Sequence, residues 1–251
     1  MLINKYKIEG LIASGGFGSI HTGRHTRTNE RVAIKIERRG ETNSLKHEAR
    51  IYNFLKDVGG VPKLKWFGTD AENMYIILPL LGENLKHHVP VSASDPGHLT
   101  TIGVEMLRII KDVHTMQIVH CDIKPENFVF DREKQTLYLI DFGFARQCKP
   151  ASTKVRACIG TPNYMSREVH NCYSPEYIDD VESLLYALLF ISQRDLPWAN
   201  KQFTNDEIRE EKTKLILATH NTAIPESLAG LLDIVATTKR GSLPNYNLFL
   251  Q

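Results

Sequence analysis

Long apolar runs are missing from this sequence of 251 residues. The longest, residues 184–191, is far shorter than the roughly 20 residues that a membrane-spanning helix needs. The first seven residues, MLINKYK, contain no apolar segment of the kind that a secretory signal requires. We therefore expect an intracellular protein, cytoplasmic or nuclear, without a membrane partner.

The sequence also has no strong excess of charge and few cysteines. Lys and Arg number 31 against 29 Asp and Glu, a net charge of +2 that gives no basic field for nucleic acid. Four cysteines without CxxC spacing exclude a zinc ribbon and are too few for a disulfide scaffold. We expect all four to be reduced thiols. The 42% of hydrophobic residues are those of an ordinary globular chain.

The predicted secondary structure changes from mainly strands to mainly helices near residue 80. Before it, residues 6–12, 32–37 and 74–78 are short strand-like runs, and residues 44–56 show the spacing of a helix. After it, the pattern predicts helices over 100–115 and 179–192 and a short strand at 137–140. These runs predict an α+β protein with a strand-rich half, 1–80, and a larger helical half, 81–251.

Two features of the first half could bind phosphate. Residues 12–20 hold three glycines between strand-like runs, which fits either a plain hairpin tip or a lid whose amides approach phosphate oxygens. Lys35 lies in a strand suited to burial, and Glu48 follows on the predicted helix. Lys35 is either a surface residue of an edge strand or, paired with Glu48, a ligand of nucleotide phosphates.

The segment 119–128, VHCDIKPENF, is the most informative part of the sequence. Asp122 can accept a hydroxyl proton, Lys124 can steady a transferred phosphoryl group, and Asn127 can hold a metal ion. Asp141, directly after the predicted strand 137–140, supplies a second oxygen ligand suited to Mg²⁺. Ordinary turns do not require these residue types at fixed offsets.

The ordered motifs AxGxxG, VAIK, a helical Glu, HxDxKxxN, DFG and GTPxY…E resemble those of a eukaryotic protein kinase across nearly the whole chain. Residues 46–52, 80–85, 122–128, 179–184 and 196–198 are similar to casein kinase I, with the vaccinia-related kinases as the second candidate. The resemblance implies a single two-lobe domain over 1–251, with a small antiparallel sheet and one helix in the N-lobe and a mainly helical C-lobe. It implies a monomer that transfers the γ-phosphoryl group of ATP to Ser or Thr of proteins; the alternative is a pseudokinase acting as a nucleotide-binding scaffold.

The resemblance also assigns roles to residues. Asp180 is similar to the buried aspartate that supports the catalytic loop of kinases, although an acid at a helix N-terminus would explain it equally. The implied catalytic residues are Asp122, Lys124, Lys35 and Glu48, and the implied Mg²⁺ ligands are Asn127 and Asp141. The implied ATP-binding residues are Ile12, Ala13, Ser14, Gly15, Gly16, Phe17, Gly18, Ser19, Ile20, Lys35, Leu78 and Leu80.

Some positions depart from the pattern. Cys121 stands where many kinases carry an arginine that pairs with an activating phosphate, so we expect activity that is not switched this way. Asn163 stands where casein kinase I has an arginine that binds acidic substrate flanks. Residues 206–212 read as a solvated helical face with charge pairs along it.

Overall fold

The computed structural model describes residues 1–15, 18–40, 44–88, 96–131, 133, 136–148, 153–199, 201–217 and 224–250. The chain divides into two compact units, each described here by itself. The first is Met1–Gly82 with Phe130–Gly143, and the second is Glu83–Val129 with Phe144–Gln251. Compared with the expected halves, the first unit therefore also takes in residues 130–143, which carry Asp141.

An antiparallel sheet of order β1-β2-β3-β4-β6-β5 forms the first unit. The predicted strands 6–12, 32–37 and 74–78 lie within β2, β4 and β6. In β4 the buried residues Val32 and Ile34 alternate with partly exposed ones, whereas β6 is apolar from Met74 to Leu78 and is buried on both faces. The strands are β1 (Leu2–Ile3), β2 (Tyr6–Gly15), β3 (Gly18–His25), β4 (Arg31–Arg38), β5 (Trp66–Thr69) and β6 (Asn73–Pro79), followed later by β9 (Thr136–Leu139).

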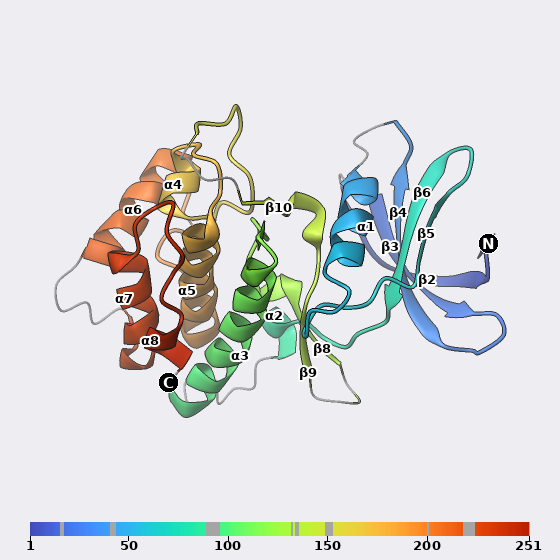
Figure 1. Cartoon of the computed structure of the whole chain (residues 1–251), viewed down its shortest axis with the longest axis horizontal. Helices are drawn as coiled ribbons and strands as arrows, with labels where there is room; N and C mark the ends of the chain where they lie inside the picture. The colour runs from blue at the N-terminus through green and yellow to red at the C-terminus, as the bar shows by residue number, and fades with distance from the viewer. Residues whose placement is uncertain are drawn as a thin grey trace. The chain divides into compact units, whose positions relative to one another are not determined.

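Helix α1 (Ser44–Phe54) packs on this sheet against β4 and β6, as Figure 1 shows. Leu45 and Ala49 lie one turn apart and join Met74 and Ile76 of β6 in a buried cluster. The predicted helix 44–56 is confirmed, ending two residues early. Glu37, at the end of β4, anchors its start by accepting the backbone N–H groups of Ser44 at 3.1 Å and Leu45 at 2.9 Å.

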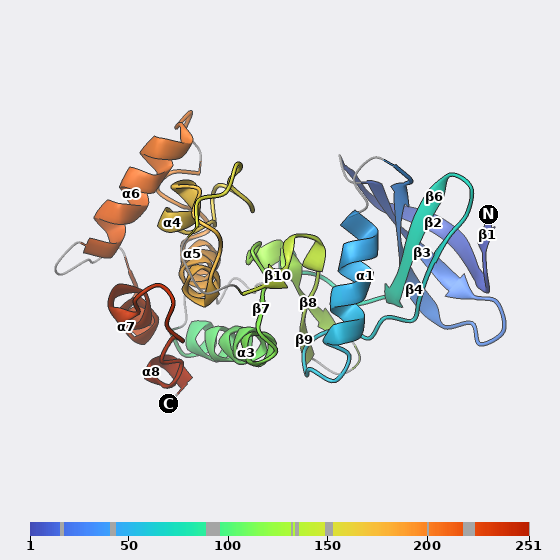
Figure 2. The same cartoon turned by 45° about the horizontal axis from the view of Figure 1, so that its top comes forward.

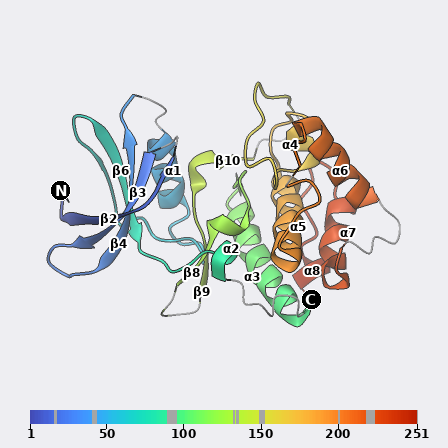
Figure 3. The same ribbon diagram turned by 180° about the vertical axis from the view of Figure 1, so that it is seen from behind.

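The second unit is mainly helical, and α3 runs beside α5 in it (Figure 3). Turning the view shows α8 close to α3, and α7 packs against α5 and α8 (Figure 2). The predicted helices 100–115 and 179–192 lie within α3 and α5, and α5 is buried on nearly every side, as its apolar sequence predicts. The helices are α2 (Leu85–His88), α3 (Pro96–Thr115), α4 (Arg167–His170), α5 (Tyr177–Gln193), α6 (Asn205–Leu217), α7 (Ala229–Thr237) and α8 (Asn247–Leu250). Short elements complete the chain: β7 (Ile118–Val119), η2 (Pro125–Asn127), β8 (Phe128–Asp131), η3 (Phe142–Phe144), β10 (Arg146–Gln147) and η4 (Glu226–Leu228).

Strand-rich and helical parts together confirm the expected α+β class. Among the described residues, no helix combines the length and the apolar character needed to cross a membrane.

The expectation of four reduced thiols is wrong for two of them. Cys158 and Cys172 form a disulfide, with their Cα atoms 4.8 Å apart. The two chain segments also pair through their backbones, where the amide of Val155 donates to the carbonyl of Cys172 at 2.7 Å. The spacing of the two cysteines in the sequence does not predict this disulfide. Cys121 and Cys148 are free thiols.

Candidate active site

A three-residue ionic cluster lies in the first unit. The ammonium Nζ of Lys35, on β4, donates to Glu48 Oε2 of α1 at 2.8 Å and to Asp141 Oδ1 at 2.8 Å. Burial alone lowers the pKa of Lys35, but the two carboxylates outweigh it and raise that pKa above its ordinary value. Burial raises the pKa of Glu48 to about 7, and the Lys35 charge opposes this shift.

An aromatic pair holds the third member of this cluster. Asp141 has a positive φ of 67°, and its backbone N–H donates to the hydroxyl of Tyr52 at 3.0 Å. Tyr52 also meets Phe142 edge to face, with ring centroids 5.2 Å apart. The same helix α1 therefore supplies Glu48 and a contact that fixes the backbone at Asp141.

The glycine-rich hairpin joins β2 to β3. Ala13 pairs with Ile20 and Gly15 with Gly18, while Gly16 and Phe17 lie outside the described residues. Gly18 has φ +120°, and a Cβ atom there would lie 2.0 Å from the carbonyl oxygen of Ile36, so only glycine fits.

The other predicted nucleotide residues lie along the same sheet. Ser14 pairs with Ser19 in the hairpin, and Leu78 of β6 lies opposite Ala33 of β4. Ile12 and Leu80 line one cavity of the first unit. The structure therefore brings Ile12 and Leu80 to a common cavity and places Leu78 on the strand next to Lys35.

A second cluster lies in the second unit, around Asp122. Its Oδ1 accepts the backbone N–H of Thr161 at 3.0 Å and the Thr161 hydroxyl at 2.7 Å. Its Oδ2 accepts Lys124 Nζ at 2.6 Å, and Lys124 also donates to the Thr161 hydroxyl oxygen at 3.0 Å. Asn127 Nδ2 donates to the backbone carbonyl of Asp122 at 2.8 Å. The arrangement gives one buried carboxylate flanked by a hydroxyl and an ammonium.

A buried aspartate beneath this cluster shapes its backbone. Asp180 Oδ2 accepts the N–H of His120 at 2.7 Å, and its Oδ1 accepts that of Cys121 at 2.9 Å. His114 Nε2 lies 3.0 Å from the same carboxylate, and its Nδ1 lies 2.7 Å from the hydroxyl of Tyr246. Cys121 has a positive φ of 70°, and burial raises the pKa of its thiol, so the group is held as a neutral packing residue.

The comparisons with known proteins agree with this geometry. The family model described as "Protein kinase domain" matches residues 6–237. The chain belongs to the protein kinase family. It is also similar to a probable casein kinase I homolog of Encephalitozoon cuniculi, with 33% identity over 97% of this chain and 86% of the relative. The resemblance to a casein kinase I-like eukaryotic protein kinase is thereby confirmed, and membership implies the two-lobe kinase fold.

Kinases use ATP with Mg²⁺, and the donors present suit this ion. The amide nitrogen of Asn127 is committed to Asp122, which leaves its carbonyl oxygen as the atom for a cation. Asp141 supplies a carboxylate whose side chain is 41% exposed. Both are hard oxygen ligands of the type that Mg²⁺ takes. Asn127 belongs to the second unit and Asp141 to the first.

Sequence reasoning missed some supporting residues and misplaced one. The anchor Glu37 and the hydroxyl of Tyr52 carry no motif of their own. The solvated helical face expected over residues 206–212 is wrong at two positions, because Ile208 and Lys212 of α6 are buried. Their spacing of four residues puts both on the inner face of the helix, and charge-pair counting gives no weight to that spacing.

Proposed function

We propose that this kinase is a casein kinase I-like serine/threonine kinase that transfers the γ-phosphoryl group of ATP to Ser and Thr hydroxyls of proteins. The observation that carries the proposal is the cluster of Asp122, Lys124 and Thr161. Two donors, the Thr161 hydroxyl and the Lys124 ammonium, hold the two oxygens of one buried carboxylate. A carboxylate fixed in this way is oriented to accept a proton.

In the reaction, the substrate hydroxyl gives its proton to Asp122 as its oxygen bonds to the γ-phosphorus. The bond from that phosphorus to the β–γ bridging oxygen breaks, and ADP leaves. Lys124 carries positive charge next to the reacting oxygen and offsets the charge of the transferred group. Thr161 fixes the rotation of the Asp122 carboxylate, so that the proton acceptor is in place before the substrate binds.

On the nucleotide side, Lys35 would contact the phosphates, and Glu48 sets its direction through the 2.8 Å ion pair. Mg²⁺ held by Asn127 and Asp141 would neutralise charge on the phosphate oxygens. The hairpin of β2 and β3 would cover the phosphates, and Ile12, with Leu78 and Leu80, would contact the adenine. As working expectations, the kinase is an intracellular monomer whose partners are protein substrates, without nucleic acid or membrane.

The test is transfer of labelled phosphate from ATP to casein, followed by identification of the labelled amino acid. We expect wild type to label serine and threonine, and Asp122→Asn and Asp141→Asn to lose at least about 100-fold in rate. Asp233→Asn, an exposed carboxylate on α7, is the matched control and keeps full activity.

If wild type and Asp141→Asn transfer equally little phosphate while wild type still binds nucleotide, the enzyme proposal fails. The chain would then be a nucleotide-binding scaffold of the pseudokinase type.

A further inference from the structure

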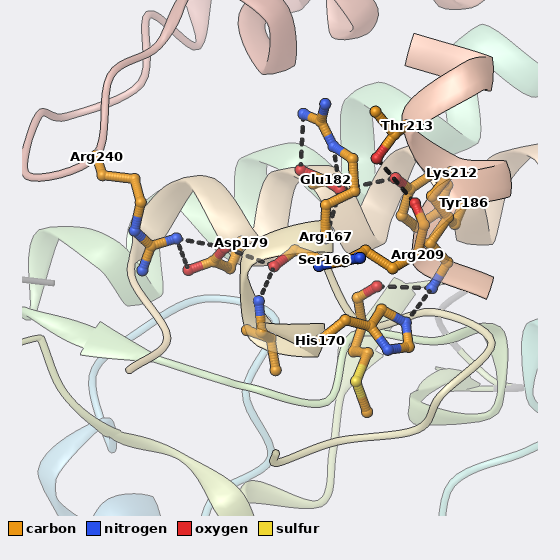
Figure 4. A network of polar contacts seen from close by, with 12 residues as sticks. Ser166, Arg167, His170, Asp179, Glu182, Tyr186, Arg209, Lys212, Thr213 and Arg240 are labelled. Carbon is orange, nitrogen blue, oxygen red and sulfur yellow. Dashed lines mark hydrogen bonds and ion pairs between the residues drawn. The ribbon is translucent and has the colours of Figure 1, made fainter. Parts of the chain in front are cut away.

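Residues 160–166 include Thr161 of the Asp122 cluster, and the backbone is constrained at both ends of this stretch. At the start, Gly160 has φ +109°, and a Cβ atom there would lie 2.7 Å from the carbonyl oxygen of Cys121. At the end, the hydroxyl of Ser166 donates to Asp179 Oδ1 of α5 at 2.5 Å, a carboxylate that also pairs with Arg240 (Figure 4). The stretch between these ends is a turn, with no strand partner to fix it.

Lys212 of α6 holds the middle of this turn. Its ammonium donates to the carbonyl of Pro162 at 2.8 Å and to that of Met165 at 2.7 Å. His170 Nε2 lies 3.1 Å from the same nitrogen. Figure 4 shows the side chains of Lys212 and His170 pointing toward each other. The side chain is fully buried, at 0% exposure. Three polar partners therefore match the three directions in which an ammonium can form hydrogen bonds.

Two aromatic rings complete the pocket of this ammonium. The nitrogen lies 4.8 Å from the ring centre of Tyr186 and 5.2 Å from that of Trp198, within the range of cation–π attraction. Trp198 also reaches the turn itself, because its indole N–H donates to the carbonyl of Asn163 at 2.9 Å. Lys212 and Trp198 together bind three carbonyls of the turn 160–166.

Burying the amine of Lys212 costs more free energy than burying an apolar side chain at the same position. Burying an ammonium requires several kcal/mol of compensation, and an apolar side chain of similar size packs a helix face at lower cost. An amine that donates to backbone carbonyls at fixed positions does, however, define the conformation of a turn that has no strand hydrogen bonds of its own. The residue after Thr161 is thereby placed by α6, while Thr161 itself is placed by Asp122.

We propose that Lys212, with Trp198 beside it, is a positioning residue for the protein substrate: it holds the turn 160–166 in the shape that receives the chain next to the phosphorylated hydroxyl. The proposal rests on the proposed kinase activity. It separates the role of α6 from nucleotide binding, whose implied hairpin and adenine contacts lie in the first unit.

The test compares Lys212→Met with Lys214→Met. Methionine keeps an unbranched stem against the rings and removes all three donors. Lys214 lies two residues away on α6, with a side chain 70% exposed and paired to Glu211, so it is the matched control. Both are assayed with a Ser-containing peptide for kcat and KM, for the KM of ATP, and for ATP hydrolysis without peptide.

For Lys212→Met, the peptide KM should rise at least about tenfold, while the KM of ATP and peptide-free hydrolysis stay within about twofold of wild type. Lys214→Met should match wild type throughout. A peptide KM within twofold of wild type would overturn the proposal. So would an equal loss of peptide transfer and ATP hydrolysis, because that pattern marks general damage.

Trp198→Phe provides the second variant in case Lys212→Met does not fold. Phenylalanine keeps a six-membered ring beside Lys212 and removes the N–H that reaches Asn163 together with the five-membered ring that carries it, so the peptide KM should rise several-fold with the KM of ATP unchanged. If Lys212→Met does not fold and Trp198→Phe leaves the peptide KM unchanged, the proposal is refuted. Wild type that transfers no phosphate to any Ser or Thr peptide instead refutes the proposed function.

Discussion

Valine in place of Thr161 removes one hydroxyl and preserves the shape of the side chain. In the structure this hydroxyl donates to Asp122 Oδ1 at 2.7 Å and accepts from Lys124 Nζ at 3.0 Å. Asp122 keeps the backbone N–H of Thr161 and the ammonium of Lys124, so the substitution deletes one hydrogen bond to the carboxylate and leaves the others. The variant therefore removes the hydrogen bond that fixes the rotation of Asp122, together with the contact between Lys124 and the same hydroxyl.

The size of the effect follows from the charge on the acceptor. A hydrogen bond to a charged group contributes about 1.5–3 kcal/mol. At 1.36 kcal/mol for each factor of ten in rate, kcat/KM for a peptide should fall about 10- to 150-fold. We expect the loss in kcat, because the bond orients the proton acceptor and does not touch the nucleotide residues of the first unit.

Steady-state kinetics with a Ser-containing peptide measures this directly, with Thr161→Ser as the control. Serine restores the hydroxyl, so its kcat/KM should lie within about threefold of wild type. If Thr161→Val also stays within threefold, the hydroxyl does not orient Asp122 and the reasoning fails. A loss of kcat/KM that came only from a higher KM for ATP, with kcat unchanged, would refute the reasoning equally.

Further predictions concern the supports of the two clusters. Asp180→Asn should lower the free energy of unfolding by about 2–4 kcal/mol in denaturant titration, because two buried N–H groups lose a charged acceptor. Gly18→Ala should lower the free energy of unfolding by about 1–3 kcal/mol, measured the same way. Alanine is strained at φ +120°, and its Cβ atom would clash with the carbonyl oxygen of Ile36. With the pKa of Glu48 raised to about 7, kcat/KM for ATP should fall as pH drops below 7 and the ion pair with Lys35 is lost; Glu48→Gln should be slow and lack this step.

Each of these has a clear counter-result. An Asp180→Asn variant as stable as wild type would show that the negative charge of Asp180 does not contribute to holding the two N–H groups. For Gly18, the control is Gly40→Ala, which has φ +86° and no neighbour within 4 Å; equal losses would mean that φ alone, and not the Ile36 contact, sets the cost. For Glu48 the linkage has the opposite sign for stability: its folded pKa lies above the ordinary value, so its protonation stabilises the fold at low pH and this contribution is lost as pH rises through 7. An unchanged pH step in Glu48→Gln would assign the step to another group.

The reactive residues could be predicted because their chemistry requires particular types at fixed offsets. Asp122 and Lys124 sit in one loop, so the sequence alone places them near each other, and the structure joins them at 2.6 Å. The pair of Lys35 with Glu48 was also expected, whereas the 2.8 Å contact of Lys35 with Asp141, which lies far away in the chain, was not.

What could not be predicted depends on long-range packing. Lys212 lies in a charged run whose natural interpretation is a solvent-facing helix, and nothing local marks the two carbonyls that it meets. Cys158 and Cys172 lack any recognisable spacing, since their meeting depends on how two loops pair. Sequence identifies groups that react, whereas partners of buried polar groups are set by the tertiary fold.

The bond between Cys158 and Cys172 closes residues 158–172 into a covalent ring that contains the turn held by Lys212. Because of this ring, cleavage of one peptide bond between residues 158 and 172 does not separate the chain into two pieces. A protease that cuts once inside the ring leaves both fragments linked, so the polypeptide keeps its full mass on a gel until a thiol reductant is added. The turn 160–166 is thus protected from separation by a linkage that peptide-bond cleavage alone does not undo.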